Sequence, residues 1–482
     1  MSGETAGAIL DSAYLITLWF PGILLARALG LKHIWASLTV GFLFSTVTVV
    51  ALFHLTALFD ATNTWWMVSK VVLLILLVLT AAIVLAKRDS AAFVSLGIAF
   101  AISAVAVVAR NILRLDGNFR GPDQFLVGWI SSLAQSGHDP SFFGGSNYVK
   151  RGFAVPLLLA QGREGQLLLS VTIVILVLVL ISTFLLASSI GTRWNSLGIS
   201  LGVAFVIVWI TMPIVWGMAF FLNGHALMAL AVASLAAQVV GKDSSIQRTR
   251  LELLIIFAAG FTLASTRPEG VALALILSFP LFVRPVAETR KRTLWRLAAM
   301  LGAPIGFVTW FMTANFFSLS PLATLFVVVG VIFAVTVVFF AVYARPTWHH
   351  VAAVSGGIAL VVVAVIQLLG SPPGLRTLTV FVSNSFLGAG QWGLAPWLFA
   401  GVMILHTIIK VDKRVTRLVE LTAFAVIFTV AVKIVDGLVI IGGVPGLSLG
   451  WFDSVNRSFF HLIALPSALF LNLGMLSTRR RS

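Results

Sequence analysis

The chain of 482 residues contains no cysteine, and only about a tenth of its residues are charged. The first absence excludes disulfides and thiolate chemistry. Acidic residues are scarcer than basic ones, 16 against 32, which gives a formal net charge of +16. In a soluble protein this excess would point to nucleic acid. In an apolar chain it is better explained by Lys and Arg that gather in the cytoplasmic loops of a membrane protein, so nucleic acid is not expected as a partner.

Apolar residues are abundant instead, at 59% of the chain, and the mean hydropathy is +1.06. Soluble domains are roughly half apolar. Apolar runs of about twenty residues recur along the whole length, enough to cross a hydrocarbon core of ~30 Å as helices. The runs are continuous rather than alternating, which excludes a β-barrel. The sequence therefore predicts an all-α polytopic membrane protein, with about 12–16 transmembrane helices in a single domain over 1–482.

The predicted spans are 8–29, 35–58, 67–85, 91–108, 165–190, 197–222, 225–240, 251–266, 271–283, 297–316, 321–344, 351–370, 393–410, 418–440 and 458–476. Their orientation follows from the basic residues that end alternate spans, because such residues mark the cytoplasmic side. This predicts a multi-pass plasma-membrane protein with its N-terminus outside and its C-terminus in the cytoplasm. The segments predicted outside are 60–66, 110–164, 223–225, 265–270, 371–392 and 437–457. The first run follows MSGETAG, which lacks a basic segment, and is expected to be a retained span rather than a cleaved signal.

The segment 110–164 is predicted to be a large first outer loop that carries short surface helices. It contains Asp116, Asp123, Asp139, His138 and Arg151 within a chain that has few charges elsewhere. Asp123 follows a proline where apolar periodicity resumes, which is typical of a residue that caps a helix lying on the membrane surface. Capping alone explains an Asp at this place. A capped carboxylate is also held in one orientation, so we single out Asp123 as a candidate for chemistry.

Two further outer segments carry candidates for binding. Arg267 and Glu269 form the tip of a short hairpin, where the planar guanidinium suits an anionic headgroup such as a lipid phosphate. Asp453, Arg457 and His461 recur every four residues and would share one face of the last span. A polar ladder in lipid is costly, so it is expected to face a wet cavity.

His225 stands at a short outer turn and is a weaker candidate, because a lone His in a turn is usually solvated. No spacing of His, Asp and Glu predicts a metal site. The chain has neither a phosphate-binding P-loop nor a dinucleotide fingerprint.

The large acidic outer loop, the hairpin tipped with Arg267-Pro268-Glu269, and the last outer segment reading WFDSVNRSFFH together resemble the GT-C superfamily. Its members are polytopic glycosyltransferases that use polyprenyl-phosphate-linked sugars. The resemblance implies that Asp123 is the general base of an inverting transfer, and that Arg267 and Arg457 hold the lipid phosphate. The chain departs from the family where Gln124 follows Asp123, so a second acid would have to be Asp116 or Asp139. It also departs in placing the large loop after about the fourth span rather than the first.

The sequence thus predicts a membrane hexosyl- or pentosyltransferase that moves a sugar from a polyprenyl phosphate to a glycan or lipid acceptor of the cell envelope, among membrane lipids as partners. No cofactor is required by the residues, and a divalent cation is left open. Three alternatives remain. The first is a polymerase or ligase of lipid-linked glycans, which needs no Asp base. The second is a transporter or flippase of lipid-linked sugars, which would show paired broken helices, and the third is an assembly or structural membrane protein without chemistry. The expected substrate-binding residues are Arg267, Glu269, Arg457, His461, Asp453, Asp116, Asp139, His138, Arg151 and His225.

Overall fold

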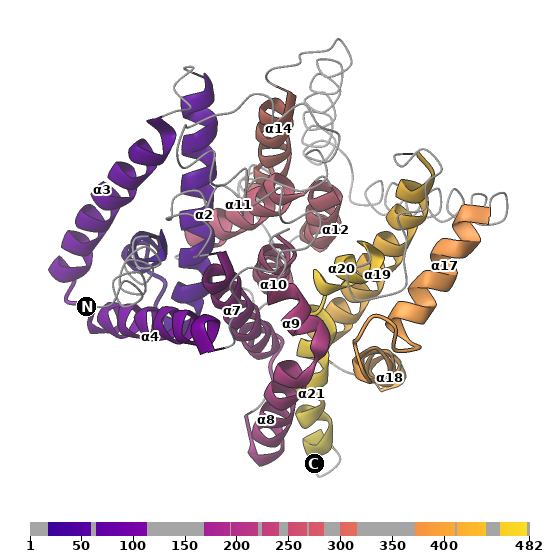
Figure 1. The fold of residues 1–482 in the computed structure, drawn as a ribbon. Helices are drawn as coiled ribbons and strands as arrows, with labels where there is room; N and C mark the ends of the chain where they lie inside the picture. Colours follow the sequence, from indigo (N-terminus) through magenta and orange to yellow (C-terminus); the bar gives the residue numbers. More distant parts are fainter. Residues whose placement is uncertain are drawn as a thin grey trace.

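The computed structural model of the protein is built of helices, and no strand occurs in the part of the chain that the structure describes (Figure 1). That part comprises residues 18–58, 64–112, 168–192, 194–219, 224–240, 249–267, 269–283, 299–315, 372–409, 412–439 and 454–479. A short helix over Leu18–Ala28 comes first. The labelled helices that follow it are α2 (Ile34–Leu58), α3 (Trp65–Ala86), α4 (Ser90–Ile112), α7 (Leu168–Ser189), α8 (Ser196–Thr211), α9 (Pro213–Ala219), α10 (His225–Val240), α11 (Thr249–Thr266), α12 (Glu269–Val283), α14 (Gly302–Asn315), α17 (Pro372–Ser385), α18 (Ala395–Ile408), α19 (Lys413–Val439), α20 (Ser454–Phe460) and α21 (Ala464–Arg479).

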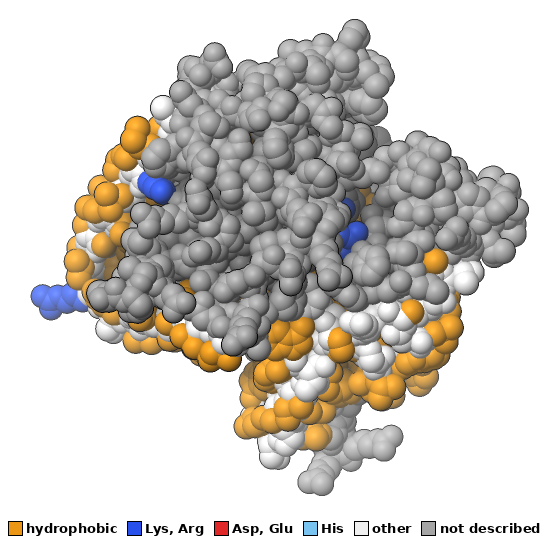
Figure 2. All heavy atoms as spheres, viewed as in Figure 1, with side chains coloured by type: hydrophobic (Ala, Val, Ile, Leu, Met, Phe, Trp, Pro, Cys, Tyr) orange, Lys and Arg blue, Asp and Glu red, His pale blue; other side chains and the backbone are white. Residues whose placement is uncertain are grey.

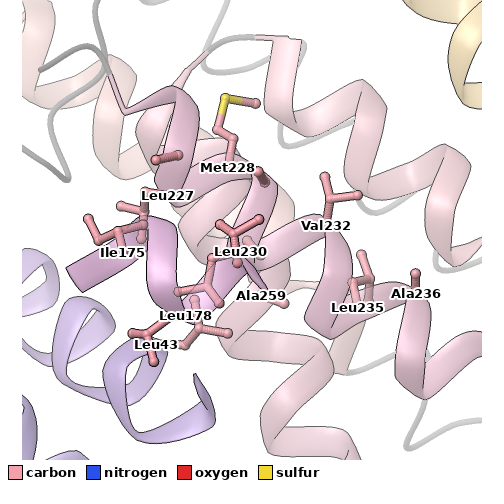
Figure 3. Packing of buried hydrophobic residues seen from close by; sticks show 14 of the residues in the cluster. Leu43, Ile175, Leu178, Leu227, Met228, Leu230, Val232, Leu235, Ala236 and Ala259 are labelled. Atoms are coloured by element: carbon pink, nitrogen blue, oxygen red, sulfur yellow. The ribbon is translucent and has the colours of Figure 1, made fainter. Parts of the chain in front are cut away.

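Helix α10 lies at the centre of the molecule (Figure 1). Every residue of it except Ala237 and Gln238 is buried. Its sequence is apolar all round, which is typical of a helix enclosed on all sides. Side chains of α2, α7 and α11 pack around it (Figure 3). The residue that begins α10 is therefore held by the core of the protein.

Helices α11 and α14 approach each other closely because α14 presents Gly302 and Gly306, one turn apart. A Cβ at Gly302 would overlap the backbone oxygen of Phe257, and one at Gly306 would lie 2.5 Å from the oxygen of Phe261. A pair of glycines at this spacing is a common means of bringing membrane helices into backbone contact. It fixes α11, whose last turn leads to Arg267.

Among the residues that the structure describes, four helices are long and apolar enough to cross a membrane: Ile34–Thr56, Met67–Ala86, Ser90–Ala109 and Ser170–Ser189. The first and last are mostly buried, whereas those in α3 and α4 are mostly exposed. Large apolar side chains such as Leu74 and Val78 cover the exposed face of α3. Figure 2 shows such side chains along the edge formed by α3 and over the lower part of the molecule. A contiguous exposed apolar surface is typical of sites that contact a membrane or another protein.

Arg27 joins two turns that the sequence placed on the same side of the membrane. Its Nε atom donates to Asp89 at 2.9 Å, and its Nη2 atom donates to the other carboxylate oxygen. Nη1 donates to the backbone oxygens of Leu31 and Lys32. The Arg27 guanidinium holds the pKa of the Asp89 carboxyl below its usual value. The ion pair thus ties the end of the first helix to the turn between α3 and α4.

Two predicted spans are interrupted in the structure, so the prediction of single helices there is wrong. The span at 197–222 divides at Met212 into α8 and α9, because Pro213 lacks a backbone N–H and disfavours helical geometry in the residue before it. The span at 458–476 divides at residues 461–463 into α20 and α21. Pro466 explains this second break, since its ring clashes with the carbonyl four residues earlier.

The segment 371–392, predicted as an outer connection, contains helix α17 over Pro372–Ser385. The two prolines at its start have the fixed φ that suits a first helical turn. The remaining predicted spans for which the structure describes residues are helical, while 321–344 and 351–370 lie outside the described residues.

Candidate functional site

Three of the predicted binding residues, from distant parts of the sequence, meet in the structure. The Nδ1 atom of His225 lies 2.6 Å from Nε2 of His461, and the Nε2 atom of His225 lies 3.4 Å from Nη1 of Arg267. The two His residues are separated by 236 positions. All three side chains are buried, with exposed fractions of 1%, 2% and 8% for His225, His461 and Arg267. We call this group the Arg–His–His cluster.

His225 is the first residue of α10, and the backbone before it explains how it is held. Gly224 has a φ of 76°, in the left-handed region that glycine adopts without strain. The oxygen of Gly224 accepts the hydrogen bond from the backbone N–H of Met228, which begins the helical ladder. The ring of His225 therefore projects from the buried start of the central helix.

Arg267 stands in the tight turn between α11 and α12. The Arg267 N–H donates to Leu263 at 3.3 Å, and the N–H of Gly270 donates back to the oxygen of Arg267 at 2.9 Å. A Cβ on Gly270 would overlap the backbone oxygen of Leu263, so only glycine permits α12 to pack back this closely. The prediction that Arg267 lies at the tip of a short hairpin is confirmed.

His461 occupies the break between α20 and α21. Its N–H donates to the oxygen of Ser458 at 3.2 Å, and the next two residues make the same bond three positions back. Such bonds tighten the chain relative to an α-helix. The α-helix that carries Arg457 ends at Phe460, so His461 follows it in this tighter turn. Asp453 lies outside the described residues, so the shared face of the three side chains stays a prediction.

The two His rings face each other by their edges. Their planes differ by 19° and their centroids lie 4.9 Å apart, whereas the facing nitrogen atoms are only 2.6 Å apart. The lone pair of one nitrogen thus points at the N–H of the other, which is good hydrogen-bond geometry. One proton lies between the rings, because two N–H groups or two lone pairs would repel at this distance.

The cluster lies where three helices begin. His225 begins α10, Arg267 precedes the start of α12 at Glu269, and His461 precedes α21 at Ala464. The N-terminus of a helix carries partial positive charge and exposes N–H donors. The buried guanidinium adds a full positive charge. The ends of α11 at Thr266 and α20 at Phe460 bring partial negative charge to the same region, so the full charge of Arg267 is the feature that favours an anion here.

Aromatic side chains form the wall next to His461. The ring of Phe460 lies 6.1 Å from that of Trp209 and 6.4 Å from that of Trp392. Trp392 belongs to the turn that follows α17, in which the oxygen of Gln391 accepts a hydrogen bond from the N–H of Ile214 at 3.3 Å. This contact satisfies a backbone donor freed by the break at Pro213. The turn after α17 thus contacts the start of α9 through Gln391 and the end of α20 through Trp392.

The other predicted site residues are placed only in part. Arg457 lies on α20, half-buried, one turn before His461. Glu269 is the first residue of α12, and its side chain is outside the described part of the structure. Asp123, Asp116, Asp139, His138, Arg151 and Asp453 lie outside the described residues.

No group of three potential metal ligands occurs among the residues that the structure describes. The facing nitrogen atoms of His225 and His461 are bonded to each other, so in this geometry the pair does not hold an ion between them. The divalent cation left open by the sequence stays untested.

Comparison of the chain with family models, curated proteins and solved structures gives no match.

His225 is buried, although the sequence predicted a solvated side chain at a short turn. The signal available was Asn223-Gly224-His225 directly before an apolar run, which marks a helix start. Nothing local could reveal its partner, because the bond to His461 exists only once α10 packs against α20. The turn after α17 was also missed as a structural neighbour, although its glycines at 388, 390 and 393 indicate a tight connection.

Proposed function

We propose that the protein is a polytopic helical membrane protein that transfers a sugar from a polyprenyl-phosphate donor to an acceptor hydroxyl on the outer face of the membrane. The observation that carries the proposal is the convergence of Arg267, His225 and His461 at the starts of three helices. The exposed apolar side chains of α3 and α4 support a location in the membrane. The buried guanidinium of Arg267 supports a phosphate ligand.

In this reaction the acceptor oxygen attacks C1 of the sugar as the bond from C1 to the phosphate oxygen breaks. The hydroxyl proton passes to Asp123, and the bonding electrons leave with the phosphate, which remains on the lipid. Charge grows on the phosphate in the transition state, so a fixed guanidinium there lowers the barrier. Arg267 is the residue that we assign to this role. Arg457, one turn from His461, is assigned to the same phosphate or to the sugar.

The test uses the purified full chain in nanodiscs, with a panel of labelled polyprenyl-phosphate sugars. Arg267→Ala is expected to reduce transfer by about 10²- to 10³-fold, the usual effect of losing one such donor. Arg267→Lys should recover part of the rate, because the charge returns without the bidentate fork.

Arg250→Ala is the matched control, since Arg250 is exposed in the first turn of α11, at the end of that helix opposite Arg267. It should leave transfer unchanged. An Arg267→Ala protein that is folded, inserted and fully active would refute the assignment.

A second candidate function is favoured by the paired helix breaks at Met212 and at residues 461–463. Transporters commonly place ligands where two interrupted helices meet. A flippase would move a lipid-linked sugar across the bilayer without breaking the bond at C1. A fluorescent prenyl-phosphate sugar in proteoliposomes separates the two functions, because a transferase yields a new glycoside and a flippase changes only the leaflet.

A further inference from the structure

The hydrogen-bond chemistry of the Arg–His–His cluster fixes where its protons are. A guanidinium has donors only. Its Nη1 atom faces Nε2 of His225, so this nitrogen carries a lone pair and not a proton. His225 is then a neutral ring with its proton on Nδ1. That N–H points at Nε2 of His461, which accepts it. The cluster is a directed chain from Arg267 through His225 to His461.

This chain has no place for a further proton on its facing atoms. A proton on Nε2 of His225 would meet the N–H groups of Arg267. A proton on Nε2 of His461 would meet the N–H of His225 at a separation of 2.6 Å. Both arrangements set two donors against each other. Because the rings are buried, water cannot relieve the conflict at low cost. His225 can therefore take a proton only when Arg267 moves away from its Nε2 atom.

An anion supplies the reason for that movement. A phosphate bound at the helix starts attracts the guanidinium, which leaves the lone pair of His225 without its donor. The same anion stabilises a positive ring beside it. We propose that the Arg–His–His cluster binds a phosphate monoester dianion with the uptake of one proton, which is held on Nε2 of His225.

The inference rests on the proposed function for its lipid ligand. It assigns the cluster to the binding of the prenyl phosphate product of that reaction. The phosphate of a prenyl-phosphate sugar is a diester with one negative charge. After the sugar has left, the prenyl phosphate is a monoester with a second ionisation near pH 6, so it is largely a dianion at neutral pH. The added charge on the product is the charge that a protonated His225 would balance. The acceptor hydroxyl gives up one proton and His225 takes up one, so the number of protons balances over the whole reaction.

Other ionisable groups lie on the helices that pack against α10, α20 and α21. At the end that carries the cluster they are Arg457 of α20, Glu269 at the start of α12, and Lys433 and Asp436 near the end of α19. Those elsewhere on these helices are His54, Arg250, Glu252, Arg376, His406, Lys413, Arg414, Arg417, Glu420 and Arg479. Helices α7, α8 and α9 carry none.

The test is titration calorimetry of the detergent-purified full chain with farnesyl phosphate, in two buffers that differ in ionisation enthalpy. The difference in heat measures the protons exchanged on binding. We expect uptake close to one proton at neutral pH, and an affinity that rises up to about tenfold per unit fall in pH between about pH 8 and the second ionisation of farnesyl phosphate near pH 6. Farnesyl methyl phosphate, a diester with one charge, should bind without proton uptake. Tighter binding of farnesyl phosphate than of inorganic phosphate assigns the ligand to a prenyl lipid rather than to free phosphate.

His225→Gln keeps an acceptor for Arg267 and removes the titrating ring. It should still bind farnesyl phosphate, with no proton uptake and little dependence on pH. If this variant does not fold, His461→Leu removes the acceptor of the His225 Nδ1–H and should reduce the uptake at neutral pH. Wild-type protein that fails to bind, that binds without proton uptake, or a His225→Gln protein that retains the uptake overturns the inference. A wild-type protein that transfers sugar but takes up no proton on binding farnesyl phosphate would overturn this inference and leave the proposed function standing. A wild-type protein that takes up the proton but transfers no sugar would overturn the proposed function and leave the phosphate site.

Discussion

Nδ1 of His225 and Nε2 of His461 lie 2.6 Å apart although 236 residues separate them in the chain. Each ring is placed by a local feature of its own segment, a glycine before α10 in one case and a proline-induced break before α21 in the other. The bond between them is therefore a property of the packing of α10 against α20 and α21. Any test of the site has to separate the loss of a side chain from the loss of this packing.

The turn at Gly270 offers such a test. Gly270→Ala places a Cβ against the backbone oxygen of Leu263, so the hairpin must open and Arg267 must shift. We expect a loss of stability of about 1–3 kcal/mol, as for other overpacked positions, together with weaker binding of a prenyl phosphate. Thermal unfolding in detergent and a binding titration measure the two effects.

Gly97→Ala is the control for helix glycines, because a Cβ there meets nothing within 4 Å. It should be neutral or stabilise the protein by up to about 1 kcal/mol. Equal behaviour of the two variants would contradict the close packing described for α11 and α12.

Asp89→Asn should destabilise the protein at neutral pH by about 1–3 kcal/mol, because it leaves the buried Arg27 without its charged acceptor. The pKa of Asp89 is lowered in the folded state, so its contribution is present above the ordinary Asp value near pH 3.9 and is lost as the pH falls through the folded-state pKa. The difference between wild type and variant should therefore shrink below about pH 4.

Unfolding curves recorded from neutral to acid pH measure this difference. Asp412→Asn serves as the comparison. Asp412 is exposed and caps α19 by accepting a hydrogen bond from the backbone N–H of Arg414, which the side-chain oxygen of Asn can also accept. It should change stability little at any pH. If the free energies of unfolding of wild type and Asp89→Asn differ by the same amount down to acid pH, the ion pair is not the cause of that difference.

Asp123→Asn is expected to abolish sugar transfer while expression and membrane insertion stay unchanged. An amide cannot accept the proton of the acceptor hydroxyl, and the loss of a general base typically reduces a rate by about 10²- to 10⁴-fold. Product formation from the labelled donor measures the effect. Binding of farnesyl phosphate should persist, because Asp123 is assigned to the acceptor. Full activity in the variant would remove Asp123 from the reaction.

The absence of cysteine makes the topology directly testable. Asn118→Cys and Lys291→Cys should be labelled by an impermeant maleimide from opposite sides of the membrane, the first from outside and the second from the cytoplasm. Both positions lie outside the described residues, so the expectation rests on the distribution of basic residues in the sequence. Labelling of both from one side would contradict the proposed orientation.

Helical segments could be predicted well where continuous apolar runs determine them. The run at 35–58 corresponds to α2 over Ile34–Leu58, and the run at 67–85 to α3 over Trp65–Ala86. The breaks at Pro213 and Pro466 were missed, because a proline within an apolar run kinks some membrane helices and divides others, depending on what satisfies the freed backbone groups. Here the oxygen of Gln391, far away in the sequence, satisfies one of them.

In the candidate site too, some residues could be predicted from the local sequence and others could not. The chemistry of Arg267 follows from its type and its place in a hairpin, both of which are local. The importance of His225 does not, because a His beside a short turn is solvated in most proteins and is buried here only by α10 and its neighbours. The role of Asp123 stays a prediction from the sequence.

The length of α10 has a consequence for how a ligand arrives. Sixteen residues span about 24 Å as a helix, which is less than the ~30 Å thickness of the hydrocarbon core. If α10 crosses the bilayer as proposed, at least one of its ends therefore lies below the level of the headgroups. Where that end is the start of the helix, a prenyl lipid reaches His225 by moving sideways between helices with its tail still among the acyl chains, while a water-soluble acceptor has to descend to meet it. Lateral entry of this kind selects for ligands by their solubility in lipid before any side chain recognises them.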